Sequence, residues 1–410
     1  MQRVMRRGEF LAIVGAAAGT GSISAQANAS AHPAQPKCGA GACPSVRVRL
    51  FGTAITRVDL VCPSGLTIAD GTESFSGMSA SFDSNAPDSA LIDNRSQPLD
   101  GPVTVLTANA PVVAAAYGAA GLIARRAYSG SLILAFGSGP SLSIVNVIDV
   151  ESYVASTLAS EVSPSWHPES LMAQAIVSRT YGMAARARSV KHDFDVTDDT
   201  ASQVYRGADG IAAAFIAAAA ATAGHVIWDG AKLAQVFYSA TCGGHTAAAV
   251  ELTGRPGPPY LAGVSDADAG GRPYCARATY FQWKNVIPSD AVARVVGIAP
   301  ASFLDIAVTE RWPDTRVKTV TISRADGEAM TLDGHAFYRM AAASLGYKVL
   351  PSTMFELHRD GESFEVNGRG LGHGVGMCQW GARGRADAGM SATEIVQAYF
   401  PGTQLRPSPA

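Results

Sequence analysis

Charged side chains are scarce in this sequence of 410 residues. Asp, Glu, Lys and Arg together supply 16% of it, against roughly 25% in an average globular domain, and the formal net charge is −2. No long run of Lys or Arg occurs, although a nucleic-acid-binding surface usually needs such clustering. The composition therefore argues against nucleic acid as a partner. It says little about an uncharged or weakly acidic glycan.

Long apolar runs are also missing, because no segment beyond the N-terminus approaches the roughly 20 residues of a membrane-spanning helix. At the N-terminus, several arginines precede a weakly apolar stretch at 11–18, and Ala25-Gln26-Ala27 offers the small residues of a cleavage site. This pattern predicts a secretory signal peptide over residues 1–27, by the Sec or the twin-arginine route, with a disordered cytosolic tail as the alternative. We therefore expect export to the periplasm or cell wall.

Cysteine is infrequent, with six in the chain. An exported chain can form disulfides, but sequence alone does not fix their connectivity. Cys38 and Cys43 are close enough in sequence for a small loop, and Cys242 with Cys275 is a plausible second pair. The remaining cysteines are Cys62 and Cys378.

Alternation of apolar and polar residues predicts strands in the first third of the chain. Residues 28–45 are rich in Ala, Pro, Gly and Ser and are predicted to be a linker, after which the alternation begins. Gly, Pro, Asn and Asp punctuate the runs, as expected for turns between short strands. Residues 46–147 are therefore predicted to be mostly β. The individual strands are expected at 46–50, 55–60, 103–106, 112–117, 132–136 and 143–147.

Helical patterns follow. Pro168 suits the first position of a helix and Glu169 suits its positive end, so 168–187 is predicted to be helical. Ser391 and Glu394 form a capping-box pattern at the start of a last helix. Other helices are expected at 211–224, 334–345 and 376–388. Further strands are expected within 198–207 and at 225–229, 233–239 and 318–323, with a hairpin of 354–358 and 363–366.

These elements predict an α+β fold with three subregions. A β-rich N-terminal region at 46–147 precedes a mixed α/β catalytic core formed by 148–285 and 346–405. A small α/β insertion at 286–345 interrupts that core.

Arg179 occupies an unusual place in the predicted helix 168–187. On a helical wheel at about 100° per residue, apolar side chains fall within an arc of about 140°, and Arg179 lies near its middle. A guanidinium there is costly unless an anion or several acceptors meet it. We therefore expect Arg179 to be buried or to face a cleft, with a specific partner. A purely structural ion pair is the alternative.

Glu161 lies upstream of that helix among small and apolar neighbours, from Leu158 to Val162. Loss of solvation favours the protonated form of a carboxyl group, which suits a general acid. A nearby Arg179 would favour the charged form instead. A solvated loop residue is the alternative interpretation.

A turn-like segment at 238–246 carries small polar residues and paired glycines, which let a polar ligand approach the backbone closely. Cys242 and His245 have the spacing of half a zinc site, although no second pair is obvious, and Cys242 also resembles a nucleophile. A tight turn with Cys242 in a disulfide is the alternative. The candidate ligand-binding residues are Tyr238, Ser239, Gly243, Gly244 and Thr246.

Glycine alternates with other residues at 368–377, without the ending of a phosphate loop or the βαβ unit of a dinucleotide fingerprint. Such glycines let the backbone approach a ligand or another strand. His373 is the ionisable group at its centre, and Gln379 is expected to line the same cleft. A packing turn around a core histidine is the alternative.

Several of these motifs together resemble the SpoIID/LytB family, that is, stage II sporulation protein D and amidase-enhancer relatives. The resemblance covers about 46–405, and its motifs occur in the family's order. They are 147–154, 158–162, 168–175, 178–181, 203–207, 242–246, 259–261, 370–384 and 399–403.

The resemblance implies a lytic transglycosylase that cleaves the MurNAc–GlcNAc bond of peptidoglycan glycan strands and leaves a 1,6-anhydro sugar. It assigns the catalytic roles to Glu161 and Arg179. A single carboxyl suffices if the C6 hydroxyl of the substrate is the nucleophile, whereas a hydrolase usually uses two. The residues expected to orient the sugar or stabilise charge are Gln203, Tyr205, Tyr238, His373 and Gln379, together with the 238–246 turn.

The metal, cofactor and partner expectations follow from the same resemblance. Some relatives carry His-Cys, as part of a metal site, where this chain has Ala201-Ser202, so no metal or other cofactor is expected. A non-catalytic, glycan-binding enhancer of a cell-wall amidase is the second hypothesis, with an amidase as partner. A cysteine hydrolase using Cys242 or Cys378 is the third.

Overall fold

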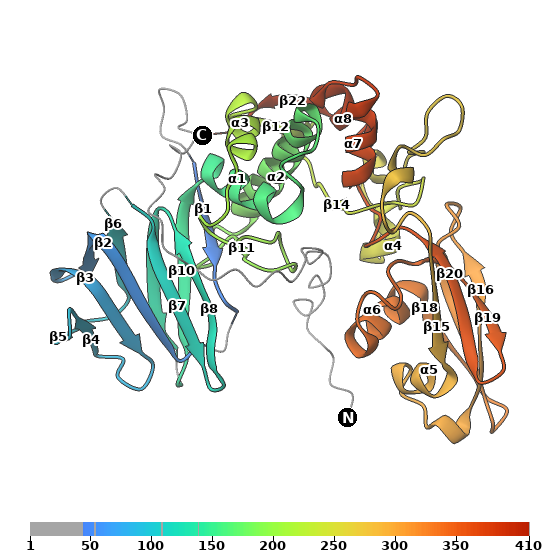
Figure 1. The fold of residues 1–410 in the computed structure, drawn as a ribbon, viewed down its shortest axis with the longest axis horizontal. Coiled ribbons are helices and arrows are strands. Elements are labelled where there is room, and N and C mark those ends of the chain that lie inside the picture. The colour runs from blue at the N-terminus through green and yellow to red at the C-terminus, as the bar shows by residue number, and fades with distance from the viewer. Residues whose placement is uncertain (1–43, 53–54, 108–109, 138, 410) are drawn as a thin grey trace.

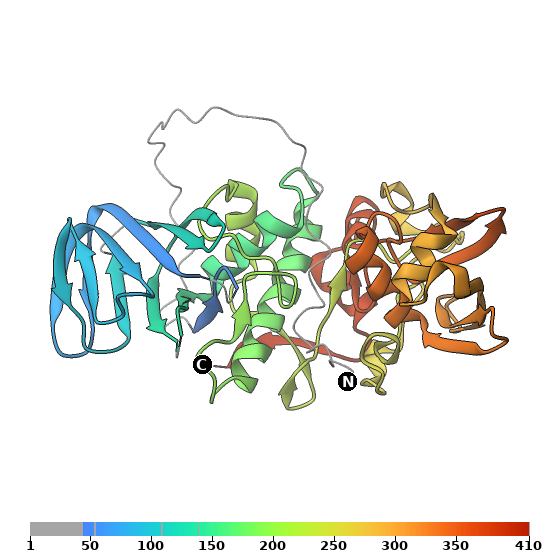
Figure 2. The same ribbon diagram turned by 90° about the horizontal axis from the view of Figure 1, so that it is seen from below.

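The computed structural model describes residues 44–409 except 53–54, 108–109 and 138. The predicted signal peptide, almost all of the predicted linker, and Cys38 and Cys43 lie outside the described residues. Helices and several sheets coexist, which confirms the predicted α+β class. Three parts follow one another along the long axis (Figures 1 and 2): a β-rich region, a helical centre, and a C-terminal part with its own sheets.

The β-rich region is one sheet in which β2 pairs with β3, β6 and β7. Alternating burial along its strands gives it a continuous apolar core. The predicted strands are all present, whereas β3, β4, β5 and β8 were missed, because their polar or largely exposed residues hide the alternation. The strands are β1 (Ser45–Arg49), β2 (Arg57–Ala69), β3 (Ser74–Asp83), β4 (Ser89–Ile92), β5 (Arg95–Pro98), β6 (Val103–Thr107), β7 (Val112–Gly118), β8 (Gly121–Tyr128), β9 (Ser131–Phe136), β10 (Leu142–Asp149) and β11 (Val196–Thr197).

Three helices form the centre: α1 (Val150–Glu161), α2 (Pro168–Arg188) and α3 (Ala213–Ala221). The sequence analysis did not predict α1, whose start is set by Asp149, an N-cap that accepts hydrogen bonds from the backbone N–H groups of Glu151 and Ser152. The prediction for α2 is confirmed. That helix is buried around most of its circumference, because it packs on both the first core and a second, C-terminal core. It is therefore the element that joins the two halves of the molecule.

The second core is built from short elements on the far side of α2. Here β14 (Tyr238–Ser239) lies parallel to β21 (Met377–Cys378), although the two are far apart in sequence. The strand expected within 198–207 is wrong, and the strand expected at 233–239 is two short pieces separated by irregular chain. The other elements are β12 (His225–Asp229), β13 (Lys232–Leu233), α4 (Ala249–Thr253), η1 (Pro259–Leu261), η2 (Tyr274–Arg277), α7 (Gln379–Asp387), α8 (Ala392–Tyr399) and β22 (Gln404–Pro407).

The third core belongs to the insertion, in which α5 and α6 pack with two three-stranded sheets. The predicted hairpin is present as β19 and β20, and β20 also pairs with β15. The hairpin thus packs with residues 283–350, whereas the sequence analysis grouped it with 346–405. The elements are β15 (Trp283–Pro288), α5 (Ser289–Val295), η3 (Pro300–Ser302), β16 (Phe303–Arg311), β17 (Val317–Arg324), β18 (Ala329–Asp333), α6 (Gly334–Leu345), β19 (Met354–Asp360) and β20 (Ser363–Arg369).

None of the helices in the described part of the chain has the length and apolar character needed to cross a membrane.

Candidate active site

Glu161 is the last residue of α1, at the junction of the first and second cores. It is not a solvated loop residue, because its side chain is only partly exposed. A helix carries partial negative charge at its C-terminus, which disfavours a carboxylate there. The position therefore keeps a carboxyl group accessible while making its ionisation less favourable.

Two hydrogen-bond donors approach the carboxyl group of Glu161. The backbone N–H of Val204 donates to Oε1 at 3.2 Å, and Nε2 of Gln379 approaches Oε2 at 3.5 Å. Burial raises the pKa of Glu161 to about 7, while hydrogen bonds from Val204, Tyr238 and Gln379 act in the lowering direction. A carboxyl with this pKa is partly protonated near neutrality, as a general acid and base requires.

Tyr238 is held beside Glu161 by a chain of hydrogen bonds. Its hydroxyl donates to Oε1 of Gln203 at 3.0 Å, and Nε2 of Gln203 donates to the hydroxyl of Tyr153 at 2.8 Å. Gln203 is buried, whereas Tyr238 is partly exposed. Gln203 therefore acts on the site through Tyr238.

Arg179 is fully buried at 0% exposure and has the specific partner that the helical wheel required. Its guanidinium donates to both carboxylate oxygens of Glu151, with the shortest distance 2.5 Å, and Glu151 is also fully buried. The remaining donors reach the hydroxyl of Thr222 and the backbone oxygens of Ala219 and His225. These contacts tie α1, α2 and α3 together. The hydrogen bonds found for Arg179 within the described chain do not include Glu161.

Other predicted site residues have different partners. Tyr205 is fully buried, stacks on Tyr153 with ring centroids 5.7 Å apart, and donates to Asn146 at 2.5 Å. Ser239 is buried, and Thr246 is buried with its hydroxyl bound to the backbone of Val264. These three residues support the fold around the site. Gly243 and Gly244 lie in the turn beyond β14, with Gly243 close to Arg369 and Met354.

The glycine-rich segment approaches another strand closely, as the sequence suggested. Gly376 has φ +77°, and a Cβ there would lie 2.1 Å from the backbone oxygen of Phe237, in the residue before β14. Any larger residue would push β14 away from β21. His373 in this segment accepts a hydrogen bond from the backbone N–H of Val375 at 3.0 Å, and burial lowers its pKa to about 3. It is therefore a neutral imidazole that supports the turn.

The two cysteines proposed as nucleophiles, Cys242 and Cys378, do not fit that role. Cys242 and Cys378 are fully buried, and burial raises the pKa of both thiols, which disfavours the reactive thiolate. The expected disulfide between Cys242 and Cys275 is wrong, because both are free and their sulfurs lie 3.8 Å apart. His245 binds the backbone of Thr246 instead of completing a site with Cys242.

Sequence reasoning missed an aromatic pair at the junction. Trp166 follows Glu161 by one short turn, and Trp380 directly follows Gln379. Their rings meet edge-to-face with centroids 5.2 Å apart, and the guanidinium of Arg383 lies over both. Both rings are partly exposed. The sequence did show that each tryptophan lies close to a candidate site residue, and this could have identified the pair.

The arrangement can donate and accept a proton at one carboxyl group. In the described chain, the groups that set the pKa of Glu161 are a backbone amide, a phenol and an amide side chain, and none is a second carboxylate. Hydrolytic glycosidases usually use a pair of carboxyl groups. The geometry thus suits chemistry in which one residue acts as both acid and base.

Comparisons with known proteins agree on one group of relatives. The model of the stage II sporulation protein family, SpoIID, matches residues 138–228. Stage II sporulation protein D of Bacillus subtilis is 30% identical over 281 residues, which cover 64% of this chain and 75% of that protein. The amidase enhancer of Bacillus subtilis is 26% identical over 286 residues, 60% of this chain but 39% of the enhancer. An uncharacterized protein of Brachyspira hyodysenteriae is 31% identical, with 68% of this chain and 72% of that protein covered.

Proposed function

Because this chain belongs to the SpoIID/LytB family, we propose that it is an exported lytic transglycosylase that cleaves MurNAc–GlcNAc linkages of peptidoglycan glycan strands. The family is linked to cell-wall lytic activity. The observation that carries the proposal is Glu161, a partly exposed carboxyl whose pKa is raised to about 7 by burial. The expected export would bring the chain to the compartment that contains peptidoglycan.

In the proposed reaction Glu161 serves first as acid and then as base. Its proton passes to the glycosidic oxygen as the bond to the MurNAc C1 carbon breaks. The C6 hydroxyl of the same MurNAc then attacks C1 and gives its proton to the Glu161 carboxylate. The product is a 1,6-anhydro sugar, no water is consumed, and the acid is restored.

The surrounding residues have separate roles in this proposal. Gln379 and the backbone N–H of Val204 steady the carboxylate that exists between the two proton transfers, and Tyr238 lies beside it. Gln203 orients Tyr238. Arg179 is a positioning residue, since its contacts fix α1 through Glu151 rather than reach the carboxyl of Glu161.

Trp166 and Trp380 are proposed to bind sugar beside the acid. Partly exposed aromatic rings offer apolar faces with a polar edge, which suit the mixed apolar and polar faces of a sugar ring. Their position on the two sides of the junction would hold a strand across Glu161.

The test is mass spectrometry of glycan strands, with and without stem peptides, after incubation with the wild type or with Glu161→Gln. Anhydro-sugar products from the wild type alone are expected. Reducing ends would mean hydrolysis and would contradict the proposed use of the C6 hydroxyl. Products from Glu161→Gln at the wild-type rate would remove Glu161 from the reaction.

The similarity to an amidase enhancer favours a second candidate: a glycan-binding protein that stimulates a cell-wall amidase without cleaving glycan itself. Under this hypothesis the β-rich region would serve binding to the partner. The two hypotheses are distinguished by measuring the activity of a cell-wall amidase after addition of the wild-type protein or of the Glu161→Gln variant. Equal stimulation by both proteins, with no glycan cleavage by either, would support the enhancer.

A further inference from the structure

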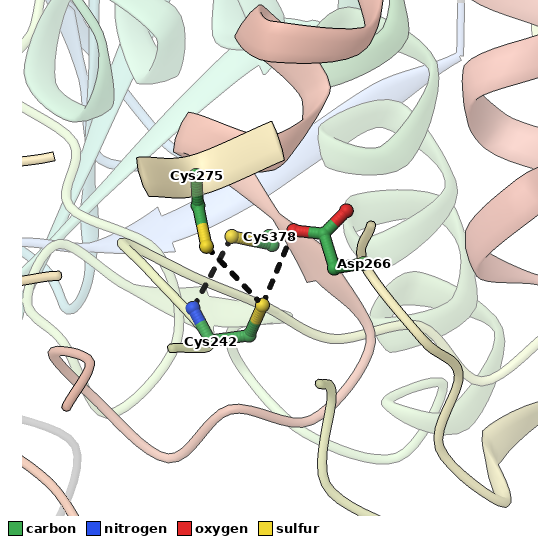
Figure 3. Close-up of side chains that lie close together, drawn as sticks. All are labelled: Cys242, Asp266, Cys275 and Cys378. Carbon is green, nitrogen blue, oxygen red and sulfur yellow. Dashed lines mark hydrogen bonds between the residues drawn. The ribbon is translucent and has the colours of Figure 1, made fainter. Parts of the chain in front are cut away.

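Four buried side chains that the proposed reaction does not use converge beside the site (Figure 3). They are Cys242, Asp266, Cys275 and Cys378, and each is 0% exposed. Their three sulfurs and one carboxylate oxygen all lie within 4.8 Å of one another. The residues come from the turn after β14, a loop, η2 and the end of β21, so only the tertiary structure brings them together.

Two distances in the cluster are close to the edges of a tetrahedral metal site. With zinc–sulfur bonds of about 2.3 Å, two sulfurs on a tetrahedron lie about 3.8 Å apart. The Sγ atoms of Cys242 and Cys275 are 3.8 Å apart. The Oδ2 atom of Asp266 lies 3.2 Å from Sγ of Cys242, a few tenths of an ångström less than the roughly 3.6 Å of an ideal sulfur–oxygen edge.

Asp266 is oriented toward the sulfurs by neighbours that bind its other oxygen. The hydroxyl of Tyr399 donates to Oδ1 at 2.6 Å, and Nε of Arg385 donates to the same atom at 3.3 Å. Oδ2 is left facing Cys242. Hydrogen bonds of this kind hold the ligands of metal sites in one orientation.

The sulfur of Cys378 is likewise held by the backbone. It accepts hydrogen bonds from the backbone N–H groups of Cys242 and Gly381, each at 3.2 Å. Amide donors aimed at a sulfur stabilise negative charge on it, as a metal-bound thiolate requires. The nearby Arg385 offsets part of the negative charge that three thiolates and a carboxylate would bring.

We propose that Cys242, Asp266, Cys275 and Cys378 bind one zinc ion. Three thiolates and one carboxylate supply all four positions of a tetrahedral site, so the role is structural rather than catalytic. Each thiol that binds releases its proton, and no oxidant or reductant is needed. The sequence analysis expected no metal from Ala201 and Ser202 alone, and these four residues are a different set.

The metal would fix one side of the candidate active site. Cys242 lies in the turn that follows Tyr238, and Cys378 directly precedes Gln379. Zinc would thus hold both residues that contact Glu161 from the far side. This consequence rests on the proposed function, whereas zinc binding itself does not.

The first measurement is the metal content of the purified full chain by elemental analysis, with cobalt substitution as the spectroscopic probe. We expect about one zinc per chain, and the strong visible absorption of tetrahedral cobalt bound to thiolates after exchange. Both readouts use the wild-type protein and so do not depend on a variant folding. No zinc, together with no cobalt–thiolate absorption in reduced protein, would overturn the proposal.

Variants then assign the ligands. Cys275→Ser and Cys378→Ser are expected to lower zinc to well below half of the wild-type content, and Asp266→Asn to weaken its retention against a chelator. Cys62→Ser is the matched control, since Cys62 is buried in the first core away from the cluster, and it should retain full zinc. Full zinc in both cysteine variants would place the metal elsewhere and overturn the assignment.

Oxidation is the competing fate of these thiols in an exported chain. Peptide mapping of the unreduced protein after alkylation distinguishes free thiols from disulfides. The site would be supported if all three cysteines react with the alkylating reagent, but only after denaturation and chelation. A disulfide between any two of them in the purified protein, before any chelation, would overturn it. Glycan cleavage is measured separately, so inactive protein with full zinc would contradict the proposed function alone.

Discussion

The two sides of the candidate active site are held together in different ways. We define the helical wall as α1 and α2, which carry Glu161 and Arg179, and the turn wall as β14, the turn after it, β21 and the start of α7. The helical wall is formed by adjacent helices joined by the Arg179–Glu151 ion pair. The turn wall is assembled from segments around 240 and 378, with buried cysteines between them.

The two walls divide Glu161 from some of the groups that surround it. The family model matches residues 138–228, so it includes the helical wall but neither Tyr238 nor Gln379. Tyr238 and Gln379, which approach Glu161 from the turn wall, therefore come from segments outside the residues that the family model matches.

The largest effect is expected from a change of Glu161, the proposed acid. Glu161→Gln removes the transferable proton and should lower the rate of glycan cleavage by about 10²–10⁴-fold, the range for loss of general acid–base catalysis. The rate is measured from anhydro-sugar formation. Glu328→Gln, at an exposed position of the insertion, is the matched control and should keep the wild-type rate. A smaller loss from Glu161→Gln than from changes in the turn wall would reverse the assignment of roles.

Breaking the ion pair tests the helical wall. Arg179→Met leaves Glu151 buried without its partner, which should lower the free energy of unfolding by about 3–5 kcal/mol in urea titrations. The double variant Arg179→Met/Glu151→Leu should lose less than the sum of the single changes, because no unpaired charge remains. An Arg179→Met protein with unchanged stability and abolished cleavage would instead give Arg179 a direct role with substrate.

A change at the N-cap of α8, in the second core, tests whether stability can fall without a loss of cleavage. The side chains and backbones of Ser391 and Glu394 form the predicted capping box of α8. Ser391→Ala should therefore lower the free energy of unfolding by about 1 kcal/mol. Cleavage at a temperature where the variant is folded should be unchanged. A loss of cleavage would mean that the turn wall depends on the packing of α8 as well as on its own contacts.

The smallest effect is expected from the hydrogen bond between the turn wall and Glu161. The bond from Gln379 stabilises the charged form of Glu161, so Gln379→Met should raise the pKa above its value of about 7. At 3.5 Å the bond is long, and a shift of about half a unit is expected. Because the acid must be protonated, the fall of kcat/KM at high pH should move upward by that amount.

The control for this pH profile is Gln282→Met, an exposed position near the insertion that should leave the profile unchanged. A downward shift from Gln379→Met would show that Gln379 stabilises the neutral acid.

The outcome for α1 shows a limit of sequence patterns. The segment 150–161 has no amphipathic stripe, because its residues are buried on almost every side, so periodicity could not identify the helix. Glu161 was therefore interpretable only as an isolated carboxyl among apolar neighbours. The position of Glu161 at a helix terminus and the partners that set its pKa became visible only in the tertiary structure.

The sequence by itself determined the α+β class, the helix at 168–187, the need of Arg179 for a partner, and the close approach allowed by the glycines around 376. Each of these follows from local patterns: periodicity, a buried charge, or backbone freedom. Only the tertiary structure decided that Glu151 is that partner, that Tyr238 and Gln379 meet Glu161, and that three cysteines and Asp266 converge. Those contacts join residues far apart in the chain, and their distances depend on how the first and second cores pack around α2.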